Sequence, residues 1–82
     1  MRKLWVGSAL CRGRLVHYYL LVKAPAGEQE EYGVLVVLGT ERALLPDLSA
    51  SRRKVRSLLA AMRRGRVTPV TAADIAEDWL LS

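Results

Sequence analysis

The sequence predicts an α+β fold in which an antiparallel meander of three or four strands is followed by two helices packed on one face of the sheet. Residues 3–45 contain short apolar runs rich in valine and leucine, and glycine-containing turns separate them. Residues 49–81 instead repeat apolar side chains at helical spacing. Because no helix interrupts the strands, the pattern lacks the crossovers that a parallel sheet requires.

The chain is short enough to predict a single domain over residues 1–82. It has 82 residues, of which 51% are hydrophobic, so it is far from the composition of disordered chains. A domain of this size buries only about 60 to 65% of its unfolded surface. Contact with a partner chain would therefore add useful burial.

The first two apolar runs predict a β-hairpin. They cover residues 3–11 and 14–23, and Arg12-Gly13 lies between them. Glycine there can supply the positive φ that a tight hairpin turn needs.

A third strand is expected over residues 32–38, after an acidic loop at 24–31 that contains proline and glycine. Residues 41–45 could form a short fourth strand. Pro46 has no backbone N–H, which confines this segment to a sheet edge or to an extended approach to the first helix.

The first helix is expected from about residue 50 to residue 64. Ser49 or Ser51 would cap its N-terminus, and Gly65 is suited to a left-handed C-terminal cap. One face of this helix carries four apolar residues at i, i+3, i+4 and i+7, namely Val55, Leu58, Leu59 and Met62.

The second helix is expected to begin at Thr71, after an extended link over residues 67–70. The Thr71 hydroxyl would accept from first-turn amides, and Asp74 would complete a capping box with an acid shorter than usual. A single apolar stripe follows on this helix, formed by Ala72, Ile75, Ala76, Trp79 and Leu80.

Four sequence elements resemble a domain-of-unknown-function family of short bacterial proteins. The elements are a Tyr-Gly-Val strand start, a Val-x-x-Leu-Leu helix, a Val-x-Pro link and a closing Asp-Ile-x-Glu-Asp segment, found here at Tyr32-Gly33-Val34, Val55–Leu59, Val67-Thr68-Pro69 and Asp74–Asp78. The stretch Arg63-Arg64-Gly65-Arg66 is more basic than the family pattern. The resemblance implies a small bacterial cytosolic protein and carries over no catalytic residue.

Few side chains suggest catalysis or metal binding. His17 is the only histidine, and residues 1–27 contain no acid that could orient it as a general base. Cys11 has no resolving cysteine, although nearby arginines would lower the pKa of an exposed thiol there. Asp74, Glu77 and Asp78 share one side of a helix, but three carboxylates alone make a weak metal site. We therefore expect a non-enzymatic protein with no cofactor and no metal.

The basic helix is the strongest candidate for a binding surface. Residues 49–66 contain seven basic residues and no acid, within a chain whose net charge is +5. Five arginines lie away from the apolar stripe and could contact the phosphates of a nucleic acid or an acidic partner: Arg52, Arg53, Arg56, Arg63 and Arg64. Alternatively this face is simply solvated, or it pairs with Glu28, Glu30 and Glu31 or with the acidic last helix.

The central strands are apolar on both faces. Only His17 is polar in residues 15–22, and residues 34–38 contain no polar side chain. Two short helices can cover one face, so the other must be covered by the fourth strand, a second copy or another protein. Our leading hypothesis is a regulatory or adaptor protein that forms a homodimer through this second sheet face, and nucleic-acid binding is the alternative.

The remaining features favour the cytoplasm. The single cysteine precludes an internal disulfide, which fits a reducing compartment. Residues 1–11 superficially resemble a lipoprotein signal, but Leu10 stands where a small residue is needed before the cysteine. No segment approaches the roughly 18 consecutive apolar residues of a membrane span, so no membrane contact is expected.

Overall fold

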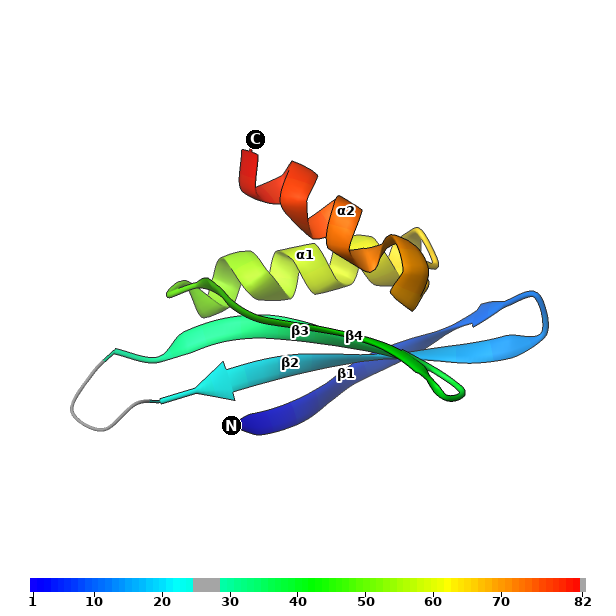
Figure 1. Ribbon diagram of the computed structural model, residues 1–82, viewed down its shortest axis with the longest axis horizontal. Coiled ribbons are helices and arrows are strands. Elements are labelled where there is room, and N and C mark those ends of the chain that lie inside the picture. Colours follow the sequence, from blue (N-terminus) through cyan, green and yellow to red (C-terminus); the bar gives the residue numbers. More distant parts are fainter. Residues whose placement is uncertain (25–28, 82) are drawn as a thin grey trace.

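A computed structural model describes residues 1–24 and 29–81, and it confirms the predicted fold class. The four antiparallel strands form one sheet in the order β1-β2-β3-β4, and both helices lie on the same side of it (Figure 1). The elements are β1 (Arg2–Cys11), β2 (Arg14–Lys23), β3 (Glu31–Leu38), β4 (Glu41–Ser49), α1 (Arg52–Arg64) and α2 (Pro69–Leu81). Residues 25–28 of the predicted acidic loop lie outside the described residues.

The predicted hairpin is formed by β1 and β2, and its tip projects past the helices (Figure 1). Arg12 and Gly13 have φ angles of 52° and 78°, so both turn residues adopt the left-handed conformation that matches the twist of the strands. A bulge between Trp5 and Gly7 shifts the register of β1 against β2. The two strands nevertheless stay paired along their whole length.

The fourth strand exists and is longer than residues 41–45, because β4 continues through Pro46 to Ser49. Pro46 is tolerated because β4 is an edge strand and the β3 pairing is interrupted between Tyr32 and Val34. The bulged backbone runs close over Gly33. A Cβ atom on Gly33 would collide with the Leu45 carbonyl oxygen and would lie 2.7 Å from the Pro46 Cα.

The core lies between the sheet and the helices. The predicted apolar face of α1 is confirmed, since Val55, Leu58, Leu59 and Met62 are all buried. They pack against alternate residues of the two central strands, which are Val16, Tyr18, Leu20, Val22, Tyr32, Val34 and Val36.

One buried hydroxyl connects the sheet to the segment between the helices. Tyr18 donates a hydrogen bond of 2.7 Å to the Val67 carbonyl oxygen, and burial raises the pKa of this phenol. The bond orients the chain where it leaves α1.

The predicted N-terminal cap of α1 is confirmed, whereas the predicted C-terminal cap is wrong. Ser51 caps the N-terminus, accepting a 3.3 Å hydrogen bond from the Lys54 amide. The prediction that Gly65 is left-handed is wrong, since its φ is −83° and Arg66 has the positive φ of 52° instead. The Arg66 amide donates to the Arg63 carbonyl and the next amide donates to the Met62 carbonyl, which is a Schellman motif displaced by one residue.

The second helix begins two residues earlier than predicted. Pro69 occupies the first helical position, where its fixed φ suits the helix and its missing N–H costs nothing. Thr71 therefore lies inside the helix and donates from its hydroxyl to the Thr68 carbonyl, so the predicted capping roles of Thr71 and Asp74 are both wrong. The extended link is correspondingly shorter than residues 67–70.

The predicted apolar stripe of α2 is only partly buried. Ala72 and Ala76 are buried, and Trp79 packs against the edge of the core. Ile75 and Leu80 are largely exposed. This helix therefore contacts the rest of the molecule through a narrower face than α1 does.

We expect Gly33→Ala to destabilise the fold by about 2 to 3 kcal/mol, because the new methyl group would displace the β4 backbone rather than a flexible side chain. Urea unfolding followed by circular dichroism measures the change. A loss below about 0.5 kcal/mol, the ordinary scatter of surface substitutions, would contradict the close approach of β4.

The displaced helix cap predicts opposite results at two neighbouring positions. Arg66→Gly should raise the free energy of unfolding by about 1 kcal/mol, since glycine adopts positive φ without a Cβ penalty. Gly65→Ala should be neutral or stabilising, because its Cβ would meet the nearest atom at 3.4 Å. The reverse order in thermal denaturation would place the left-handed residue at Gly65.

Candidate functional site

The sheet face opposite the helices, here called the open face, carries a continuous row of large apolar side chains. The pairing register places Trp5 opposite Tyr19, Tyr19 opposite Leu35 and Leu35 opposite Leu44, so one residue from each strand contributes. Side chains alternate between the two faces of a strand, and the helix-facing neighbours of these residues form the core. We call these four residues the central row.

The central row is exposed at both of its ends. Trp5 is 62% exposed on the outer strand β1, and Leu44 is 54% exposed on the outer strand β4. Leu10 and Leu15 extend the apolar surface toward the hairpin tip, and each is more than half exposed. Exposed single leucines are ordinary, and here the exposed residues lie on the two edge strands, with Leu35, only 3% exposed, between them.

Parts of the open face are covered by the chain itself. Leu21 and Leu35 are each only 3% exposed although neither belongs to the core beneath the helices. The Lys3 ammonium lies 5.3 Å from the centre of the Tyr19 ring, and the β4 bulge crosses Gly33. The fourth strand therefore covers one corner of the face and leaves the ends of the central row in contact with solvent.

A polar relay of three side chains lies beside the central row. The Trp5 indole N–H donates to the Ser8 hydroxyl oxygen at 3.3 Å, and the Ser8 oxygen lies 2.7 Å from His17 Nδ1. Because indole can only donate, the Ser8 oxygen accepts from Trp5 and its own proton is available to Nδ1. Ser8 thus satisfies two polar groups in an otherwise apolar surface.

The other predicted candidates for chemistry remain apart from one another. In residues 1–24 and 29–81, no group of three or more histidine, cysteine or acidic side chains could hold a metal ion. Asp74, Glu77 and Asp78 are exposed on α2, and Cys11 packs partly against the core. A serine and histidine pair needs a third group that orients the base, and no described acid bonds to His17.

The arginines of α1 are exposed and separate into two groups. Arg63 and Arg64 join Arg66 around a hollow beside β1, and Arg63 Nε donates to the Ser8 carbonyl oxygen at 3.1 Å. Arg52 and Arg56 line a second hollow near the start of the helix. Arg53, the remaining predicted binding residue, is exposed and lines neither hollow.

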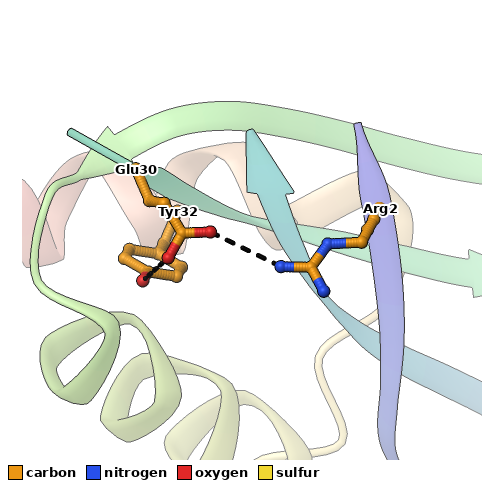
Figure 2. A network of polar contacts seen from close by, with 3 residues as sticks. All are labelled: Arg2, Glu30 and Tyr32. Atoms are coloured by element: carbon orange, nitrogen blue, oxygen red, sulfur yellow. Dashed lines mark hydrogen bonds and ion pairs between the residues drawn. The ribbon is translucent and has the colours of Figure 1, made fainter. Parts of the chain in front are cut away.

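Glu30 already has two side-chain partners, neither of which belongs to α1. Glu30 accepts from Arg2 at 3.4 Å and from the Tyr32 hydroxyl at 3.0 Å (Figure 2). The hydrogen bond to Glu30 raises the pKa of Tyr32.

No α1 arginine forms an ion pair in the part of the chain that the structure describes, where the two ion pairs are Arg2–Glu30 and Lys23–Asp47. The predicted pairing of this helix with Glu30 or Glu31 is therefore not found. Glu28, the third acid of that prediction, lies outside the described residues.

Sequence reasoning missed two features of these surfaces. The sequence places Trp5 and Ser8 in a strand, and only the β1–β2 register shows that Ser8 lies opposite His17. The sequence places Arg66 after the helix, although it lines the same hollow as Arg63. Strand register could have been proposed from the two-residue turn at Arg12-Gly13, and Gly7, a glycine inside a strand pattern, is a signal for the bulge after Trp5.

The comparisons with known proteins place the chain in a family without assigning it an activity. No helix in the described residues is both long and apolar enough to cross a membrane. No curated protein and no solved structure matches the chain. A family model matches residues 8–82, which is most of the sequence, and confirms the resemblance to a family of unknown function. The protein therefore belongs to the family of unknown function DUF6514.

Proposed function

We propose that this protein is a small, non-enzymatic bacterial protein of the cytoplasm that acts as a regulatory or adaptor module and forms a homodimer through its open face. The observation that carries the proposal is the central row of Trp5, Tyr19, Leu35 and Leu44, which crosses all four strands without a polar residue. An apolar surface of this kind is stabilised when another surface removes it from water.

The size of the open face fits the size of a dimer interface. Four strands about 4.8 Å apart, each contributing about eight residues at about 3.3 Å, give a projected area on the order of 500 Å². Two such faces in contact would bury on the order of 1,000 Å² or more, which is the lower limit for a specific interface. A chain of 82 residues gains a large fraction of its total burial from such a contact.

The charges at the ends of the open face favour a second copy as the occupant. Glu31 pairs with Lys23 near one end of the sheet, and Arg42 pairs with Val37 near the other. A two-fold axis perpendicular to the strands would place the Glu31 end of one copy over the Arg42 end of the other. Glu31 of one copy would then lie toward Arg42 of the other, while Lys23, directly opposite Glu31, is already paired with Asp47.

Leu44→Glu tests this interface. The wild-type chain of 9.1 kDa should show twice that mass by light scattering at high concentration, with little dependence on salt. The substitution places an unpaired carboxylate at the end of the central row, so we expect the dissociation constant to rise at least about tenfold.

The matched control is Val70→Glu, which makes the same kind of change at an exposed aliphatic residue on α2, 76% exposed. This variant should dimerise like the wild type. A wild-type protein that remains monomeric across the concentration series would overturn the proposal, and so would equal weakening by both variants.

A further inference from the structure

Two shallow hollows lie along the junction between α1 and the edge strand β1, and arginines line both of them. At the C-terminal end of α1, Arg63, Arg64 and Arg66 line a hollow of about 400 Å³ together with the Ser8–Leu10 segment of β1. At the N-terminal end, Arg52 and Arg56 line a hollow of about 200 Å³ beside Leu4–Val6 of the same strand. We call this surface the α1–β1 groove.

Arg66 occupies a position where the backbone favours glycine. Its φ of 52° is the left-handed conformation of a helix C-terminal cap, and Gly65 stands one residue earlier in an ordinary helical conformation. A stabilising sequence would have glycine at residue 66. Arg12 and Asp47 share this conformation, so the φ angle alone assigns no role, and Arg66 is included because it lines the same hollow as Arg63 and Arg64.

Arg63 is held in place before any ligand binds. Its Nε donates to the Ser8 carbonyl oxygen, and its side chain lies across Gly7, where a Cβ atom would come within 2.9 Å of Nε. The glycine and the carbonyl together fix the direction of this guanidinium. A fixed guanidinium loses less conformational entropy when it forms paired hydrogen bonds to a phosphate.

The spacing of the two arginine groups indicates a polymeric ligand. Arg52 and Arg63 are eleven residues apart, which is about 16 Å along a helix. A single small anion cannot contact both groups, whereas a nucleic-acid strand presents a phosphate about every 3.4 Å of duplex axis. No described acid forms an ion pair with these arginines, so their charge is available to such a strand.

We propose that the α1–β1 groove binds a nucleic-acid strand through its phosphates, with Arg52, Arg56, Arg63, Arg64 and Arg66 as the contacting residues. The five arginines come from α1 and the chain just after it, on the helix side of the sheet (Figure 1). Trp5 and Leu10 also line the hollows and belong to the open face, so the edge strand β1 contributes to both surfaces. Trp5 belongs to the wall of the N-terminal hollow, beside Arg52 and Arg56.

The test is a salt series of binding by fluorescence anisotropy, with fluorescein-labelled single-stranded RNA, single-stranded DNA and duplex DNA as the probes. Five phosphate contacts predict that the logarithm of the association constant falls with the logarithm of salt with a slope of about −3.5 for a single strand. Arg64→Gln should reduce the steepness of this slope by about 0.7 and weaken binding of all sequences alike.

Arg66→Gly separates a binding role from a structural one. This variant should be at least as resistant to thermal unfolding as the wild type and yet bind more weakly, with the slope again less steep by about 0.7. Loss of binding through a damaged fold would instead accompany a lower melting temperature. The control is Arg53→Gln, which removes one arginine charge from the same helix at an exposed residue that lines neither hollow, and it should leave binding within about twofold of the wild type.

Three results would overturn the proposal. One is binding that does not weaken between about 50 and 200 mM salt, since phosphate contacts must release counterions. Another is an equal loss in Arg53→Gln, which would mean that total charge and not the groove attracts the strand. The third is displacement of the RNA and DNA probes by polyglutamate at an equal concentration of charge, which would assign the groove to an acidic protein.

Discussion

Two helices can cover only one face of a four-stranded sheet, and this constraint governs the rest of the molecule. Both α1 and α2 follow the last strand in the chain and pack on the same side, where they bury one face of the two central strands (Figure 1). The other face has equally apolar central strands, with Leu21 and Leu35 at its middle. The helix-facing side chains of these strands form the core, and the alternate side chains of the same strands form the surface available to a partner.

The two edge strands, β4 and β1, are protected in different ways. On one side, β4 bends over Gly33 and continues through Pro46, which covers a corner of the open face and removes a backbone donor from the edge. On the other side, the Ser8 carbonyl of β1 accepts from Arg63. The same contact that satisfies an edge carbonyl also directs an arginine into the α1–β1 groove, so protection of the edge and formation of a basic surface are coupled.

Local chemistry explains which parts of this structure were predictable. The turn at Arg12-Gly13, the Ser51 cap and the apolar face of α1 each depend on residues close together in sequence, and the structure confirms all three. The errors arose where distant backbone or a neighbouring residue decides. Gly65 has the right chemistry for a left-handed cap, but the left-handed residue is Arg66, one position later. The open face follows from the composition of the central strands, whereas the alignment of the central row depends on two bulges whose sequence signals are Gly7 and Gly33, glycines inside strand patterns.

The central claim is that a second copy covers the open face, and fluorine NMR of the 5-fluorotryptophan-labelled protein tests it most directly. The chain has two tryptophans, of which Trp5 ends the central row and Trp79 packs beside the core on the helix side. As protein concentration increases, the Trp5 signal should shift and lose its solvent isotope effect, while the Trp79 signal stays constant. A Trp5 signal that keeps its full solvent isotope effect at concentrations where the protein is dimeric would contradict the account.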